Sequence, residues 1–175
     1  MTSDTSPTAR VVVGFDGSDA ALEALGSAAR MASLLKAKLE VVQAWHYPTS
    51  YGGFPIGASW APDEDATLTL RAGLHRCFGR EIPSWVEARI AEGQPARVLL
   101  RASRGAEMLV VGSRGHGGFA GLLLGSVSSA CAEHATCPVL VVHSDAHDAE
   151  ARAATAHDDD HAEPQRVDLE ATVPL

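Results

Sequence analysis

Six glycines crowd the fifteen-residue stretch GSRGHGGFAGLLLGS, from Gly112 to Ser126, which contains no carboxylate and no lysine. We call it the glycine loop. The apolar run MLVV precedes it and VSSACAEHA follows it, so the pattern predicts a loop between a buried strand and a helix. Glycine lets a ligand approach backbone N–H groups without an intervening side chain. Such N–H groups, beside the free amides of a helix that begins near Gly125, favour an anion. The residues therefore predict a phosphate-binding loop.

A strand-to-helix loop rich in glycine can also be merely flexible. The P-loop pattern GxxxxGK[ST] is absent, and GxGxxG does not follow the first predicted strand, which argues against a nicotinamide cofactor. Ser126 and Ser128 add hydroxyl donors, Arg114 could pair with a phosphate or extend into solvent, and we expect His116 to be solvated rather than catalytic.

Strands and helices are expected to alternate along the chain. Short β-branched runs predict strands, and apolar residues at helical spacing predict helices, the first of them capped by Ser18. The strands are expected at Arg10–Phe15, Lys38–Trp45, Ser84–Gly93, Ala106–Gly112 and Pro138–Ser144, and the helices at Ser18–Lys36, Asp63–Gly79, Gln94–Gly105 and Gly125–Ala135. This order predicts an α/β domain whose open parallel sheet has helices on both faces. Ligands of such sheets bind at the carboxyl ends of the strands, where GFDGS and the glycine loop would meet.

Length and charge bound the domain organisation. The chain has 175 residues, 46% of them hydrophobic, which suits one domain with its own core and some remaining chain. The net charge is −8, and residues 144–175 hold nine acidic and two basic residues, so the tail carries most of it. We expect a disordered N-terminus at 1–8, a domain at 9–144 and a disordered acidic tail at 145–175. A loop rich in Gly and Pro is expected at 47–62.

Several partner classes are excluded or disfavoured by composition. The acidic balance argues against nucleic acid as the main partner. No apolar run is long enough to span a bilayer and no secretory signal is recognisable, so we expect a cytoplasmic protein without a membrane partner. Three cysteines without framework spacing are expected to be reduced. Cys131, His134 and Cys137 have C-x2-H-x2-C spacing, but we interpret them as packing residues, and we assign no metal ligand. The acidic HDDDH at 157–161 is expected to stay solvated.

The glycines of the loop fit the spacing Gly-x2-Gly-x9-Gly-Ser, with Gly112, Gly115 and Gly125 followed by Ser126. The blocks VVVGFDGS, VVGSRGHGG and CPVLVVHS stand around them in order. In these motifs, over about residues 9–144, the sequence resembles the universal stress protein family. The resemblance implies a Rossmann-like five-stranded parallel sheet of order 3-2-1-4-5. It also implies an ATP site, with Mg²⁺ held mainly by the phosphates.

The resemblance also implies roles for individual residues. Asp16 would lie near the base or ribose, Ala44 would offer its backbone to adenine, and Gly115 with residues 125–128 would hold the phosphates. The complete set of expected nucleotide-binding residues is Gly14, Phe15, Asp16, Ala44, Val111, Gly112, Ser113, Arg114, Gly115, Gly125, Ser126, Val127 and Ser128. We assign no catalytic residue, because no Ser-His-Asp arrangement or carboxylate pair is apparent.

The sequence is compatible with three functions. The first is an ATP-binding regulatory module of the stress response, with little or no turnover. The second is an enzyme, either a slow Mg-dependent ATPase or a nucleotidyl transferase, although the His-x-Gly-His signature of such transferases is missing after the first strand. The third is a scaffold that has lost nucleotide binding. The resemblance further implies a homodimer through the edge strand Pro138–His143, and the regulatory protein partner is unknown.

Overall fold

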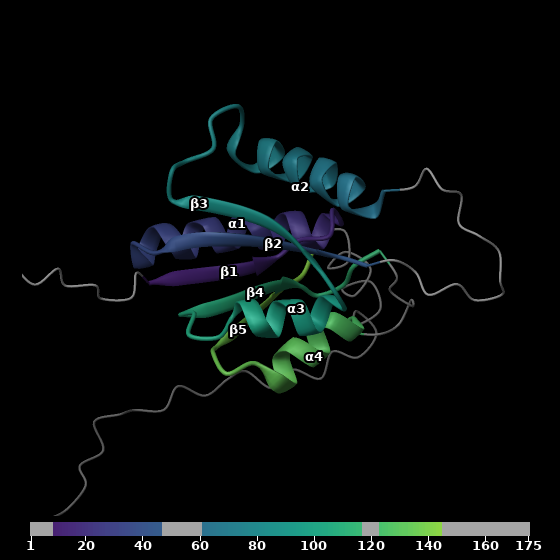
Figure 1. Cartoon of the computed structure of the whole chain (residues 1–175). Coiled ribbons are helices and arrows are strands. Elements are labelled where there is room, and N and C mark those ends of the chain that lie inside the picture. Colours follow the sequence, from purple (N-terminus) through teal and green to yellow (C-terminus); the bar gives the residue numbers. More distant parts are fainter. Residues whose placement is uncertain (1–8, 47–60, 117–122, 145–175) are drawn as a thin grey trace, which may run out of the picture. The chain divides into compact units, whose positions relative to one another are not determined.

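The computed structural model describes residues 9–46, 61–116 and 123–144. The expected N-terminal segment, the Gly- and Pro-rich loop up to residue 60 and the acidic tail with its HDDDH segment lie outside the described residues, as does the middle of the glycine loop at 117–122. Within the described residues, strands and helices alternate as the sequence predicts (Figure 1). The elements in chain order are β1 (Arg10–Gly14), α1 (Asp19–Leu35), β2 (Lys38–Trp45), α2 (Pro62–Phe78), β3 (Val86–Glu92), α3 (Pro95–Ala102), β4 (Met108–Gly112), α4 (Ser126–His134) and β5 (Val139–Val142).

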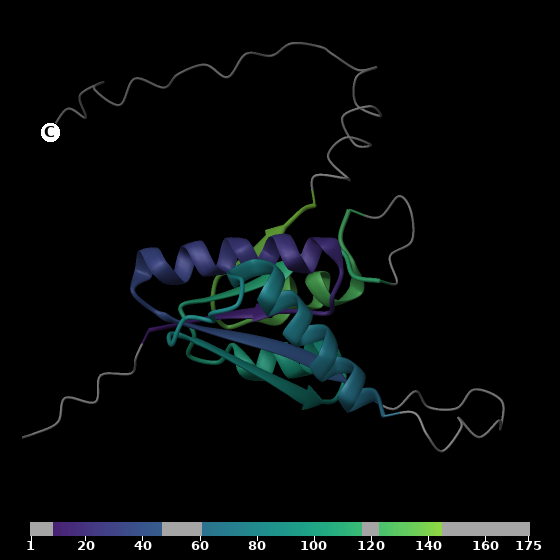
Figure 2. The same cartoon turned by 90° about the horizontal axis from the view of Figure 1, so that it is seen from above.

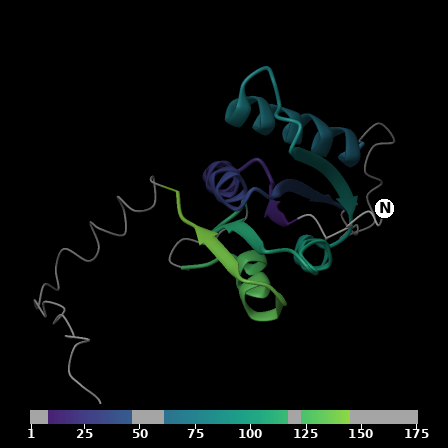
Figure 3. The ribbon, with the colours of Figure 1, turned by 90° about the vertical axis from the view of Figure 1, so that its left-hand side faces the viewer.

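The five strands form one parallel sheet of order β3-β2-β1-β4-β5, which confirms the predicted Rossmann-like topology. β1 lies at the centre, and its residues Val11, Val12 and Val13 are completely buried. Such a run is apolar at every position because helices cover both faces of a central parallel strand. Figure 3 shows α1 and α2 on one side of the sheet and α3 and α4 on the other. Each side has its own core cluster.

Helix α1 begins where the sequence predicts. The side chain of Ser18 accepts a hydrogen bond from the backbone N–H of Ala21 over 3.2 Å, which satisfies one of the free amides of the first turn. A row of alanines on α1 packs against the sheet, and α2 lies beside α1 above the sheet (Figure 2). The helix is expected to extend to Lys36, but it ends one residue earlier, and Leu35 is 48% exposed. The helix ends there, because Lys36 adopts a left-handed conformation with φ 52° and turns the chain toward β2.

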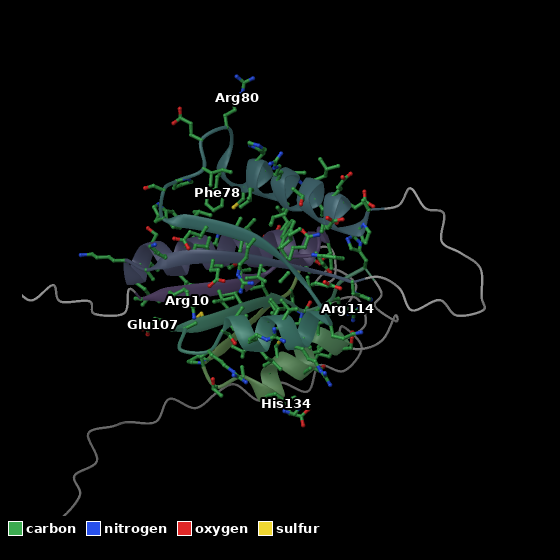
Figure 4. All side chains as sticks on the ribbon, in the orientation of Figure 1. Arg10, Phe78, Arg80, Glu107, Arg114 and His134 are labelled. Carbon is green, nitrogen blue, oxygen red and sulfur yellow. The ribbon has the colours of Figure 1, made fainter. Side chains whose placement is uncertain are left out.

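A buried carboxylate joins the three strands at the amino-terminal end of the sheet. Glu40 on β2 forms ion pairs with Arg10 on β1, at 2.9 Å, and with Arg89 on β3, at 2.6 Å. Arg10 also donates to the backbone oxygen of Arg104 over 2.9 Å. In Figure 4, Arg10 lies at one end of the sheet and Arg114 at the other. The strand ends beside Arg114 are the carboxyl ends, where the sequence predicts the ligand site.

Candidate functional site

A cavity of about 670 Å³ opens at the carboxyl ends of β1, β2 and β4. Its walls come from the loop after β1, the described parts of the glycine loop, and the N-termini of α3 and α4. The structure brings together around it every expected site residue except Ser113, which is buried behind the wall. The expected residues that line it are Gly14, Phe15, Asp16, Ala44, Val111, Gly112, Arg114, Gly115, Gly125, Ser126, Val127 and Ser128.

The loop after β1 holds Asp16 in a defined position. Its Oδ1 atom accepts hydrogen bonds from the backbone N–H of Ser18, at 3.0 Å, and from the Ser18 hydroxyl, at 2.6 Å. The preceding residue, Phe15, donates its backbone N–H to the oxygen of Val42 over 3.0 Å. The turn between Asp16 and Ser18 includes Gly17, whose φ of +87° favours glycine. The carboxylate is therefore directed by the same turn that starts α1.

Two glycines of the site are required by close packing, each against a different neighbour. A Cβ atom on Gly112 would lie 2.8 Å from the backbone carbon of Ala20, so this glycine permits α1 to approach the end of β4. A Cβ atom on Gly115 would overlap Oδ2 of Asp16, so this glycine permits the two loops to meet. Gly112 lines the cavity, but the close helix packing by itself explains why glycine stands there. The sequence assigned both residues to the ligand alone.

The N-terminus of α4 presents free backbone amides to the cavity. Gly125 caps this helix without a side-chain hydrogen bond, and the N–H groups of Ser126, Val127 and Ser128 precede the first intrahelical bond, from Ser129 to Gly125. The three residues line the cavity. Free amides and the positive end of the helix dipole form an anion site. This confirms the helix start that the sequence predicts behind the glycine loop.

The hydroxyl of Ser128 has a different role from the expected one. It lies 2.8 Å from the backbone oxygen of Ser113 and 3.0 Å from that of Gly125, and it donates its proton to these carbonyls. The sequence predicted a donor to phosphate, whereas the structure shows a buried hydroxyl that joins the end of β4 to α4. Ser113 contributes to the site in the same indirect way, through its backbone.

Another part of the cavity lining is apolar. It is formed by side chains that sequence reasoning missed, from β2 and from the start of α3: Val42, Pro95 and Leu99, with His46 beyond the end of β2. Leu99 packs on Gly14, where a Cβ atom would lie 2.7 Å from its Cδ1 atom. The available signal was Pro95 at the first turn of a helix that directly follows β3, because this helix must begin at the same edge of the sheet. An apolar surface and an anion site in one cavity suit a ligand with a flat ring and a phosphate.

Asp16 and Arg114 are the formally charged residues among those that line the described cavity. His116 is exposed, as expected, but its ring is not simply solvated. Its Nε2 atom lies 3.0 Å from the backbone oxygen of Asp16, so the ring nitrogen donates a hydrogen bond to the loop after β1. This contact connects the glycine loop to the other loop of the site.

Of the C-x2-H-x2-C residues, the two cysteines pack in the core, whereas His134 does not. Cys131 is completely buried in the core beside α3, and burial raises the pKa of its thiol to about 11, with a further contribution from the Cys137 thiol. His134 is exposed and lies 3.7 Å from Glu133. Within the described ranges, no group of three or more His, Cys, Asp or Glu side chains could hold a metal ion. No helix in those ranges is long and apolar enough to span a bilayer.

The fold and the cavity define a class: Rossmann-like α/β domains whose ligand site lies where the strand order reverses. Comparison with known proteins narrows this class. The model of the universal stress protein family matches residues 7–143, and the chain belongs to that family.

The relatives differ in how much of their length this chain spans. A universal stress protein of Mycolicibacterium smegmatis is 39% identical over 134 residues, which are 75% of this chain and 45% of the relative. The chain thus spans about half the length of such mycobacterial relatives. Universal stress protein YxiE of Bacillus subtilis is 30% identical over 144 residues, which are 76% of this chain and 97% of that protein.

Solved structures show the same fold. A universal stress protein crystallised in complex with cAMP is 30% identical, with a TM-score of 0.60 over 80% of this chain and 100% of that one. UspA from Lactobacillus plantarum has a TM-score of 0.64 at 20% identity, over 79% of this chain and 99% of that one, a likeness of fold.

Proposed function

We propose that this protein binds ATP in the 670 Å³ cavity and acts as a nucleotide-responsive regulator in the stress response. The observation that carries the proposal is the pairing of two unlike walls. The free amides of Ser126, Val127 and Ser128 form one, and the apolar residues around Leu99 form the other. The cAMP complex of a relative that is 30% identical supports an adenine nucleotide as the ligand.

The residues of the cavity fit such a ligand. The amides at the start of α4 would hold a phosphate group, and Gly115 leaves the backbone bare where the two loops meet. The backbone of Ala44, together with Pro95 and Leu99, would face the base. Mg²⁺ would be held mainly by the phosphates, and the described residues offer no cluster of three metal ligands. Asp16 is the carboxylate among the described residues that line the cavity.

The proposal assigns the site to binding rather than to turnover. Hydrolysis requires groups that place the attacking water and neutralise charge on the leaving phosphate. In the described lining, Arg114 is the formally cationic side chain and no lysine is present. We therefore expect little or no ATP turnover. A slow Mg-dependent ATPase or a nucleotidyl transferase on the same fold is the alternative, and it would have to use Asp16.

The regulatory role implies partners. The four-residue strand β5 forms an edge of the sheet, and we propose that two copies of the chain pair there to form a homodimer. A protein partner would then sense whether nucleotide is bound. We place the protein in the cytoplasm, a reducing compartment that suits its three free cysteines.

The decisive experiment is to purify the protein without added nucleotide, denature it and identify released small molecules by mass spectrometry. Calorimetry with ATP and with cAMP, each with and without Mg²⁺, follows on the stripped protein. Adenine nucleotide in near-stoichiometric amount, or ATP binding at physiological concentration, supports the proposal. A preparation that is empty and binds neither nucleotide overturns it. Release of phosphate from ATP well above the buffer rate would favour the ATPase instead.

A further inference from the structure

The two loops of the cavity meet at a small junction. His116 Nε2 lies 3.0 Å from the backbone oxygen of Asp16, and it is also close to Gly17, where a Cβ atom would be 3.6 Å from the same nitrogen. One residue earlier, Gly115 fits against the carboxylate of Asp16 with no room for a Cβ atom. Asp16, Gly115 and His116 all line the cavity. The junction is therefore part of the cavity wall.

The chemistry of the junction is fixed by its acceptor. A backbone carbonyl has no proton to give, so Nε2 of His116 must carry one. Both the neutral ring with its proton on Nε2 and the imidazolium can make this bond. The hydrogen bond to Asp16 therefore requires an N–H donor where Nε2 lies, and it does not require a charged ring.

The loops that meet there are anchored elsewhere on opposite sides of the site. Phe15 donates its backbone N–H to Val42, which holds the loop after β1 toward β2. Ser113 donates to Val142 over 2.7 Å, which holds the start of the glycine loop toward β5. The hydrogen bond from His116 to Asp16 joins the two loops to each other.

We propose that His116 is a positioning residue that fastens the glycine loop to the loop after β1 and thereby slows the release of bound nucleotide. The inference rests on the proposed nucleotide function and deepens it. Since the junction forms part of the cavity wall, it holds the glycine loop in place beside the bound ligand. Its loss frees the segment around Gly115 and raises the dissociation rate, while the encounter with nucleotide is unaffected.

The test compares side chains that separate the donor from the ring. His116→Ala removes both, His116→Phe keeps a ring without a donor, and His116→Gln keeps an N–H near the position of Nε2. His134→Ala, at an exposed site on α4, is the matched control. Dissociation of mant-ATP, chased with excess ATP, is followed by stopped-flow fluorescence for each variant. Backbone hydrogen exchange of residues 14–18 and 112–116 is measured without nucleotide.

We expect His116→Ala and His116→Phe to release mant-ATP about two- to tenfold faster, the effect of one neutral hydrogen bond. His116→Gln and His134→Ala should stay within about twofold of the parent rate by the same measure. Faster exchange in both loop segments should accompany the faster release. A parent-like rate for His116→Ala, or a rate for His116→Gln as fast as that of His116→Ala, overturns the role of the donor. If the parent protein fails to bind mant-ATP, the proposed function fails, and hydrogen exchange alone decides whether His116 fastens the loops.

Discussion

The hydroxyl of Ser128 donates to the backbone oxygen of Ser113 over 2.8 Å, and this bond fixes the first turn of α4 to the end of β4. The same oxygen accepts the N–H of Gly125 at 2.7 Å, and the N–H of Ser113 is bonded to Val142 in β5. The position of the free amides of α4 is therefore set by the sheet itself. An anion site built in this way is preorganised, because its donors need not be gathered when the ligand arrives.

Replacing Ser128 with alanine should destabilise the fold by about 0.5–1.5 kcal/mol, the contribution of one buried hydrogen bond. Nucleotide affinity should fall as well, since the first turn of α4 loses its fixed position. Urea unfolding and calorimetry measure the two effects. Ser129→Ala, at the exposed next residue of the same helix, is the control. Equal stability of the two variants would show that the Ser128–Ser113 bond adds nothing.

Gly115→Glu should abolish most nucleotide binding. The new side chain would have to start where Oδ2 of Asp16 already lies, and it would add a second carboxylate beside the phosphates. We expect an affinity loss of at least about a hundredfold, since several kcal/mol of steric and like-charge conflict are involved. Calorimetry with ATP measures it, and circular dichroism verifies the fold. Undiminished affinity in a folded variant would place the phosphates elsewhere.

Gly112→Ala should destabilise the protein itself. Its Cβ atom would press on the backbone of Ala20 and Ala21, which cannot move aside as a flexible side chain would. We expect a loss of about 1–3 kcal/mol in the free energy of unfolding, the usual cost of overpacking. Gly26→Ala is the matched control, because nothing lies within 4 Å of a Cβ atom there. That change, inside α1, should instead stabilise by about 0.5–1 kcal/mol.

Cys131 should be the slowest of the three cysteines to react with iodoacetamide in the native protein. It is completely buried, and burial raises the pKa of its thiol to about 11, so almost no thiolate is present at neutral pH. Alkylation at pH 8, followed by peptide mass spectrometry, gives the order of reaction. Modification of Cys131 before Cys77 and Cys137 would contradict the buried position.

The same thiol predicts a direction of pH dependence. Between its ordinary pKa of 9.0 and its folded pKa of about 11, the unfolded chain loses the proton first. The folded state then binds more protons than the unfolded state, so stability falls as pH rises through this window. Cys131→Ala should have a shallower decline than the parent between pH 9 and 11 in urea titrations. An equal decline of stability in the parent and the variant would mean that other groups dominate the pH dependence.

The sequence predicts the fold far better than it predicts the roles of single residues. β2 has the predicted bounds, and the strand order is confirmed, because β-branched runs separated by helices permit few arrangements. The glycine spacing likewise pointed to the edge of the sheet where the cavity opens. Leu99 was missed because it reaches the cavity from another strand–helix unit, whose position at this edge was indicated only by Pro95 at the first turn of α3. The packing role of Gly112 and the internal bond of Ser128 depend on distances that only the folded chain defines.

Glu40, held between Arg10 and Arg89, has a consequence for how the strands align. Its neighbours on β2, Leu39 and Val41, face the core below α1 and α2. A slip of β2 by one residue would exchange the faces, placing the carboxylate in that core and away from both arginines. An unpaired buried charge costs several kcal/mol, so the misaligned sheet is strongly disfavoured. The ion-paired carboxylate thus fixes the alignment of β2 with its neighbours on both sides.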